Sequence, residues 1–243
     1  MSRFQSLFGI KPVIGMIHLS GGESTRIERA LEELTIYEEQ GINGAIIENY
    51  HGSDQDVATV LDIVSKRRTR LILGVNILPN EFDLAFTLAK RYGAGFIQID
   101  YVAGRYSGGE EIDVADYQEK RRSFQDILVL GGVWPKYYAP IEGSNLEDDV
   151  REGIQRADAL VVTGEGTGKE TPLEKIKSFR RVAGDQFPLI VGAGATPTNI
   201  VDALQIADGV IVGSYLKRDE ITRYPVDRQR VQEFMIAVAR ARP

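Results

Sequence analysis

Cysteine is absent from the 243 residues of this chain. That absence excludes disulfide bonds, thiolate metal sites, iron–sulfur clusters and a cysteine nucleophile. Long hydrophobic runs are also missing: the apolar stretches have the length of strands, below the roughly 18 residues that indicate a membrane span. The N-terminal segment lacks the basic start, apolar stretch and small-residue cleavage site of a secretory signal. We therefore expect a cytoplasmic protein with no transmembrane segment.

An excess of positive charge is equally missing. The formal net charge is −6 at pH 7, whereas nucleic-acid-binding domains usually carry a basic footprint. A local basic cluster such as Lys66–Arg68 is expected to form a solvated helix end. We therefore expect no nucleic-acid partner.

Short β-rich runs alternate with helical patterns along the whole chain. The runs are almost continuously apolar, which is typical of strands in a parallel sheet covered on both faces. The intervening segments carry one apolar stripe each, as at Ile27, Ala30, Leu31 and Leu34. Eight strands are predicted, at Pro12–Leu19, Gly44–Asn49, Arg70–Ile77, Phe96–Asp100, Ile127–Val133, Ala159–Gly164, Pro188–Ala195 and Gly209–Ser214.

This alternation predicts an α/β protein with the (β/α)8, or TIM-barrel, fold. A chain of 243 residues is close to the roughly 250 that are typical of one such barrel. An open doubly wound sheet is the alternative, but such sheets usually have fewer strands and a recognisable switch point. We expect residues 1–243 to form one domain. The glycine-bearing segment Tyr101–Asp113 could be a lid over the barrel mouth or an unstructured surface loop.

Glycines follow the seventh and eighth predicted strands, where many TIM barrels bind phosphate. Gly192 and Gly194 would let the backbone approach a ligand, and Thr196 could cap a helix that begins at Pro197. The neighbouring strand ends in Gly213 and Ser214. Together these residues predict a phosphate-binding site, with tight turns as the alternative role of the glycines.

The loop after the sixth strand, Thr163–Thr171, superficially resembles a nucleotide-binding P-loop. A P-loop requires glycine five positions before its Gly-Lys pair, and this chain has Thr163 there. We interpret the segment as a mobile loop in which Thr163, Gly164 and Gly168 face the ligand. Lys169 could balance the ligand's charge or simply be exposed.

Polar residues interrupt the apolar strands at their downstream ends. Because burying them against a helix would be costly, they are expected to face the barrel lumen or its mouth. Glu48 and Asp100 could act as general acid or base or coordinate Mg²⁺; a structural hydrogen-bonded network is the alternative. His18 is a third catalytic candidate because an imidazole can titrate near neutral pH. Candidate substrate-binding residues at these strand ends are Asn49, Asn76 and Gln98.

The loop after the fifth strand places Lys136 near the same rim. This lysine could form a Schiff base if desolvation lowered its pKa, or it could bind an anion, which we favour. Trp134 and Tyr137 could line the pocket or pack against the barrel edge.

In combination, several segments resemble the BtpA family. They are Lys11–Leu19, Gly44–Asn49, Gly74–Asn80, Ala157–Gly164, Val191–Pro197, Ala207–Gly213 and Pro225–Val231. The resemblance implies a phosphate-binding TIM barrel, and by analogy peripheral membrane association, since the family is named for a photosystem I biogenesis factor. The chain departs from the family pattern at Ser20–Glu23, a shortened loop, and at Val133–Lys136, which replaces an aspartate-bearing run.

Two functions of different classes follow from these patterns. The first is an isomerase or lyase that acts on a phosphorylated sugar or nucleotide-like metabolite. The second is a non-catalytic assembly or biogenesis factor, similar to the photosystem I factor, that keeps a pocket for a phosphate ligand. Both are compatible with a homo-oligomer, and a TIM barrel alone does not decide between them.

Overall fold

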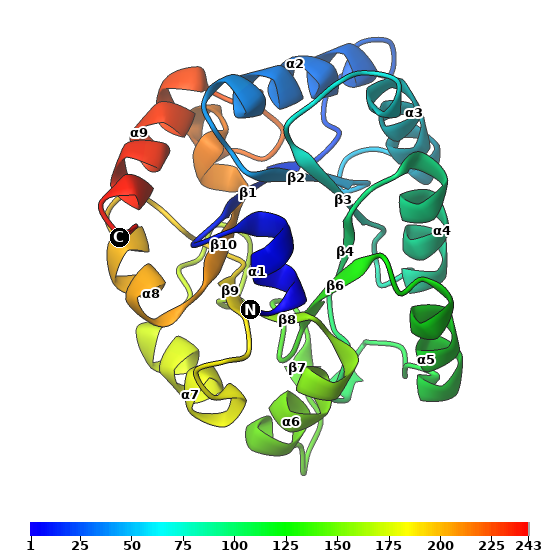
Figure 1. Cartoon of the computed structure of the whole chain (residues 1–243), viewed down its shortest axis with the longest axis vertical. Coiled ribbons are helices and arrows are strands. Elements are labelled where there is room, and N and C mark those ends of the chain that lie inside the picture. Colours follow the sequence, from blue (N-terminus) through cyan, green and yellow to red (C-terminus); the bar gives the residue numbers. More distant parts are fainter. Residues whose placement is uncertain (243) are drawn as a thin grey trace.

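Eight parallel strands close into a barrel in the computed structural model, which describes residues 1–242 (Figure 1). Each predicted run contains one barrel strand, so the predicted (β/α)8 fold is confirmed. The strand order around the barrel follows the chain, and each strand pairs in parallel with its neighbours. The barrel strands are β1 (Val13–Ile17), β2 (Gly44–Glu48), β3 (Ile72–Asn76), β4 (Phe96–Ile99), β6 (Leu128–Gly132), β8 (Ala159–Val162), β9 (Leu189–Val191) and β10 (Gly209–Val212).

An outer ring of helices covers the barrel, as Figure 1 shows. Their apolar stripes pack on the outward faces of the strands and form the larger hydrophobic core with them. Local signals set the helix ends: Ser53 caps one helix through a capping box, and Gly93 ends the next in a left-handed conformation. The helices are α2 (Arg26–Glu39), α3 (Asp54–Ser65), α4 (Phe82–Tyr92), α5 (Val114–Ser123), α6 (Leu146–Arg156), α7 (Leu173–Ala183), α8 (Ile200–Ile206) and α9 (Arg228–Ala239).

A short N-terminal helix, α1 (Arg3–Phe8), closes the end of the barrel where the strands begin (Figure 1). Phe4 and Phe8 are buried and join the side chains that fill the lumen. The ring of Phe8 lies 5.2 Å from that of Phe96, edge to face. Gly74 makes room for Phe96, because a Cβ at position 74 would overlap its ring. With this end filled, a ligand can enter only from the C-terminal ends of the strands.

Two loops at the barrel mouth pair with each other. The strand β5 (Tyr106–Ser107), after β4, pairs in antiparallel fashion with β7 (Ala139–Pro140), after β6. Tyr101 and Val102 are buried. The segment Tyr101–Asp113 therefore contains a short strand, and none of its residues lines the central pocket.

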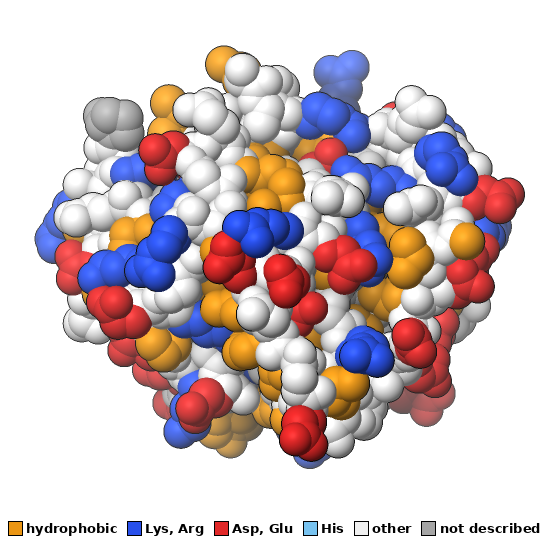
Figure 2. All heavy atoms as spheres, turned by 90° about the horizontal axis from the view of Figure 1, so that it is seen from below, with side chains coloured by type: hydrophobic (Ala, Val, Ile, Leu, Met, Phe, Trp, Pro, Cys, Tyr) orange, Lys and Arg blue, Asp and Glu red, His pale blue; other side chains and the backbone are white. Residues whose placement is uncertain are grey.

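The side of the molecule over α6 and α7 carries acidic and basic side chains intermixed, with hydrophobic side chains between them (Figure 2).

Among residues 1–242, no helix has the length and apolar character needed to cross a membrane.

Candidate active site

A pocket lies where the C-terminal ends of the barrel strands meet. Most of the residues predicted from the sequence to contact a ligand line it. They are His18, Glu48, Gln98, Asp100, Lys136, Thr163, Gly168, Gly192, Gly194, Gly213 and Ser214. Strand alternation explains this convergence, because Gln98 and Asp100 share the inward face of β4 and its extension.

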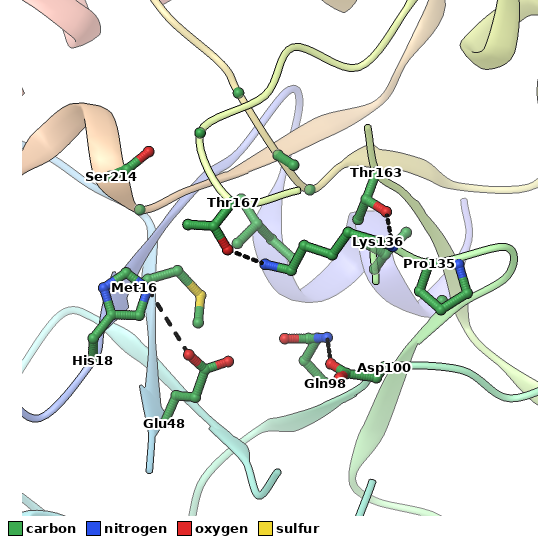
Figure 3. A pocket seen from close by; sticks show the side chains of 18 residues that line it. Met16, His18, Glu48, Gln98, Asp100, Pro135, Lys136, Thr163, Thr167 and Ser214 are labelled. Atoms are coloured by element: carbon green, nitrogen blue, oxygen red, sulfur yellow. Dashed lines mark hydrogen bonds and ion pairs between the residues drawn. The ribbon is translucent and has the colours of Figure 1, made fainter. Parts of the chain in front are cut away.

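Carboxylate and amide groups form a chain on one side of the pocket. Asn76 is the buried last residue of β3, which lies between β2 and β4. Its Nδ2 donates to Glu48 Oε1 at 2.7 Å and to Gln98 Oε1 at 2.8 Å. Glu48 and Asn76 are register partners on neighbouring strands, which brings these side chains together. Glu48 Oε2 is therefore left facing the pocket, as Figure 3 shows beside Gln98 and Asp100.

His18 lies next to Glu48, with Nε2 3.9 Å from Glu48 Oε2. Its side chain is buried, and Nδ1 has no hydrogen-bond partner among residues 1–242. The ring rests against Gly213, where an added Cβ would lie 2.9 Å from His18 Cε1. Glycine at this position therefore lets the imidazole line the pocket.

Burial shifts the ionisation of these groups toward their neutral forms. Burial raises the pKa of Glu48 to about 7; the charge of Lys136 opposes this shift and that of Asp100 adds to it. Burial also raises the pKa of Asp100, again opposed by Lys136. The pKa of His18 is held well below its usual value by burial, and then by the charges of Lys217 and Lys136. Near neutral pH, Glu48 can therefore either accept or donate a proton, while His18 is neutral.

Unpaired backbone N–H groups occupy the opposite side of the pocket. Within residues 1–242, those of Gly194, Gly213 and Ser214 donate to no backbone or side-chain acceptor, whereas that of Gly192 bonds to Val162 O at 2.8 Å. In Figure 3, Ser214 lies across the pocket from Gln98 and Asp100. Several free N–H donors on adjacent loops form the kind of concavity that holds a phosphate oxygen.

Lys136 extends between the two sides of the pocket (Figure 3). Its backbone N–H donates to Thr163 Oγ1 at 2.8 Å, and Nζ donates to Thr167 Oγ1 at 3.2 Å. No carboxylate lies within ion-pair distance of Nζ in the part of the chain that the structure describes. The ammonium group therefore remains available for an anionic ligand.

Three of the predicted ligand residues lie outside the pocket lining. Asn49 points away from it and donates to Asp54 Oδ1, while Leu78 N–H donates back to Asn49 Oδ1. Asn76 lies beneath the pocket, and Gly164 lines a neighbouring hollow. In these positions Asn49 and Asn76 hold the strand ends in place rather than line the pocket.

The loop after β9 differs from its prediction. The helix begins at Ile200 and not at Pro197, with Asn199 as its N-cap residue. Asn199 Oδ1 accepts the Thr196 N–H at 2.9 Å, and Asn199 Nδ2 donates to Gly194 O at 2.9 Å. These two hydrogen bonds fix the loop. The unpaired N–H donors of the pocket are therefore those of Gly194, Gly213 and Ser214, and no helix start at Pro197 adds further donors.

Gly194→Ala is expected to lower the free energy of unfolding by roughly 1–3 kcal/mol. Gly194 has φ +63°, and a Cβ there would overlap the backbone at Lys169 and Glu170. Gly93→Ala is the matched control, since Gly93 has φ +72° with no atom near its Cβ position. Urea unfolding should show the larger loss at Gly194, and equal losses would contradict a tight contact between these loops.

Two features were not predicted from the sequence: Thr167, which joins Lys136 to the loop after β8, and the buried pair Glu33–Lys217. Glu33 lies three residues after Ala30 on the inward stripe of α2, a position from which its burial could have been predicted. No group of three or more metal-ligating residues occurs in residues 1–242. Mg²⁺ binding by Glu48 and Asp100 remains a prediction.

The fold and this pocket define a TIM barrel with a polar pocket at the C-terminal ends of its strands. The chain belongs to the BtpA family, whose sequence model matches residues 9–240. It is 30% identical to the photosystem I biogenesis protein BtpA of Synechocystis over 98% of this chain and 92% of that protein. It is 31% identical to an uncharacterised protein of Pyrococcus furiosus over 93% of this chain and 94% of that protein.

Solved structures with similar folds are TIM barrels of low sequence identity. One is phosphoribosyl anthranilate isomerase of Thermus thermophilus, with a TM-score of 0.65 at 14% identity, covering 95% of this chain and all (100%) of that chain. Another is thiamine phosphate pyrophosphorylase of Pyrococcus furiosus, with a TM-score of 0.66 at 12% identity, covering 96% and 98%. At such identities the likeness establishes the fold alone.

Proposed function

We propose that this protein is an enzyme that isomerises or cleaves a phosphorylated small molecule. The main support for this proposal is that one pocket combines unpaired backbone N–H donors with the Glu48 carboxyl group, whose pKa is raised to about 7. The donors of Gly194, Gly213 and Ser214 bind the phosphate, and Lys136 neutralises its charge. Binding the phosphate there positions the rest of the molecule against Glu48.

Glu48 is the acid–base residue of the proposed reaction. Its carboxylate removes a proton from a carbon beside a carbonyl group. In an isomerisation the resulting acid returns the proton to the former carbonyl carbon, while the hydroxyl proton passes to the former carbonyl oxygen; in a cleavage the acid returns the proton to the leaving group. Asn76 fixes the orientation of the Glu48 carboxyl group through the 2.7 Å hydrogen bond. His18, which is neutral, and Asp100 lie around the reacting carbons as hydrogen-bonding groups, and Gln98 contributes its amide.

The names of related proteins support two different classes of function. Phosphoribosyl anthranilate isomerase and orotidine 5′-phosphate decarboxylase are similar barrels whose names include a phosphorylated substrate. The Synechocystis relative is instead named for photosystem I biogenesis. An assembly factor that senses a phosphate ligand is therefore the second candidate, and it differs from the first by binding without turnover.

A thermal-shift screen of sugar phosphates, nucleotides and inorganic phosphate tests the proposal. A ligand that binds the native pocket should raise the melting temperature by mass action. Any compound that does so is then followed by phosphorus and carbon NMR for conversion. Conversion supports the enzyme, stabilisation without conversion supports the sensor, and no stabilisation by any phosphate compound contradicts both.

Lys136→Met is expected to weaken binding of such a ligand by roughly ten- to a hundredfold, because a hydrogen bond to a charged group contributes about 1.5–3 kcal/mol. Lys169→Met is the matched control. Lys169 lies in the same loop as Thr167, but its side chain is exposed and does not line the pocket. Calorimetric titration of both variants should show the loss at Lys136 only; equal affinities would remove Lys136 from the phosphate site.

A further inference from the structure

A second, larger hollow opens beside the pocket. Its volume is about 600 Å³, whereas that of the pocket is about 50 Å³. Sites that enclose small ligands usually measure some hundreds of Å³, and 50 Å³ holds only a few water-sized groups. A ligand whose phosphate binds in the pocket must therefore extend beyond it.

The walls of this hollow are mainly aromatic and apolar. We call the surface formed by Trp134, Tyr137, Tyr138, Pro140, Leu146 and Pro172 the aromatic shelf. Tyr137 is 65% exposed, although its ring is large and apolar. An exposed group of aromatic side chains next to a polar pocket is typical of a ligand-binding surface.

The aromatic shelf is continuous with the pocket. Pro135 and Lys136 line both hollows, and Figure 3 shows Pro135 at the edge from which Lys136 extends into the pocket. Tyr137 OH accepts the N–H of Thr167, a pocket residue, at 2.8 Å. Ligand atoms that leave the phosphate site past Lys136 therefore meet the shelf directly.

Specific contacts hold the shelf in an unusual conformation. Trp134 and Tyr137 have φ of +50° and +70°, values that bulky residues seldom adopt. Trp134 Nε1 donates to Asp149 Oδ2, and Lys175 Nζ donates to both Trp134 O and Thr163 O, each at 2.8 Å. These contacts fix the rings relative to Thr163 in the pocket wall. Strained backbone of this kind occurs preferentially at ligand sites.

We propose that the ligand of the pocket carries a planar aromatic ring and that this ring lies on the aromatic shelf. The inference rests on the proposed phosphate site and selects a substrate class for it: nucleotide-like compounds rather than simple sugar phosphates. The shelf supplies ring faces for stacking, and the free N–H groups and Lys136 supply the phosphate contacts. Stacking accepts many rings because every one has a π-face, so the shelf specifies the class and not the individual base.

Trp134 makes the proposal directly measurable, because it is the only tryptophan of the chain. Adenosine and uridine 5′-monophosphates are titrated against ribose 5-phosphate, which carries the same phosphate and sugar without the ring. At least one nucleotide should bind roughly five- to 150-fold more tightly than ribose 5-phosphate and change the fluorescence of Trp134. Ribose 5-phosphate should bind without that fluorescence change.

Two variants at Tyr137 separate the ring from its hydroxyl group. Tyr137→Ala removes the ring and should bring the ratio of nucleotide to ribose 5-phosphate affinity close to one. Tyr137→Phe keeps the ring but loses the contact with the Thr167 N–H, and it should keep most of that ratio. Because Tyr137 is largely exposed, both variants should fold, which their melting temperatures check.

The outcomes distinguish this inference from the proposed function. Equal affinity for the nucleotides and ribose 5-phosphate, with unchanged fluorescence of Trp134, overturns the ring site and leaves the phosphate site intact. A fluorescence change that depends on protein concentration and not on ligand overturns it in favour of a second copy of the chain on the shelf. If neither inorganic phosphate nor any phosphorylated compound binds, the proposed function fails first, and the inference fails with it.

Discussion

Lys217→Met is expected to lower the free energy of unfolding by about 3 kcal/mol or more. The Lys217 side chain is 0% exposed, and Nζ donates to Glu33 Oε2 at 2.7 Å. Methionine has a similar length, but it leaves the buried carboxylate of Glu33 without its hydrogen-bonded cation. The remaining contact of that carboxylate with Arg29, at 3.4 Å, offsets only part of the loss.

The reason for so large an effect is the position of Glu33. Its other oxygen accepts the Val226 N–H at 3.0 Å, so one side chain of α2 fixes both ends of residues 217–226. That segment begins directly after the 3-10 helix η1 (Ser214–Leu216), whose first residue lines the pocket. Removing the pair should therefore also weaken phosphate binding at Ser214.

Lys66→Met is the control for Lys217→Met. Lys66 makes the same kind of pair, at 2.6 Å to Asp62, but its side chain is 69% exposed. Exposed pairs of this spacing contribute about 0.5 kcal/mol or less. Urea unfolding of the two variants compares the same substitution in two environments. A loss below about 1 kcal/mol at Lys217 would show that the buried pair does not stabilise the fold.

The fold could be predicted because its signal is repeated along the chain. Each apolar run of strand length is followed by a helical stripe, and continuous apolar runs of this length are typical of parallel strands that are buried on both faces. The exact helix start after β9 could not be predicted in the same way. Pro197 is a frequent first residue of a helix, but the Asn199 side chain bonds to the Thr196 N–H and holds a turn there instead.

The pocket could be predicted only in part. Residues at strand ends, such as Glu48 and Asp100, are brought together by the barrel topology itself. Asn49 follows the same rule in sequence, yet the two-residue period of a strand turns its side chain away from Glu48. Trp134 and Tyr137 were candidates for the pocket lining, but they line the neighbouring hollow. Their arrangement there, and the position of Thr167, depend on how long loops pack against each other, and no local pattern encodes that packing.

Glu48→Gln is expected to slow turnover of the proposed substrate strongly while keeping its binding. Loss of a general acid–base group costs roughly 10²–10⁴-fold in rate. Glutamine keeps the shape of Glu48 and can still contact Asn76, so ligand affinity should change little. The substrate is the phosphorylated compound found by thermal shift, and its conversion by the variant is followed by NMR.

The pH dependence provides an independent test of the role of Glu48. As a base, Glu48 must be ionised, so kcat/KM should rise with pH around a midpoint near 7, the pKa of its carboxyl group. Glu28→Gln, a change at an exposed residue of α2, should leave this profile unaltered. A profile that is flat between pH 5 and 8, or full activity of Glu48→Gln, would exclude Glu48 as the base.

The same pKa makes a prediction that requires no substrate. Burial raises the pKa of Glu48 from 4.5 to about 7, so between these values the folded protein binds more protons than the unfolded chain. The stabilisation from this proton uptake is complete below about pH 4.5. It decreases progressively as the pH rises and is lost once the pH has passed through about 7. Relative to Glu48→Gln, which does not titrate, the native protein should lose roughly 3 kcal/mol between pH 4.5 and 8. Urea unfolding of both proteins across this range measures the difference, and parallel curves would show that the carboxyl group ionises as it does in water.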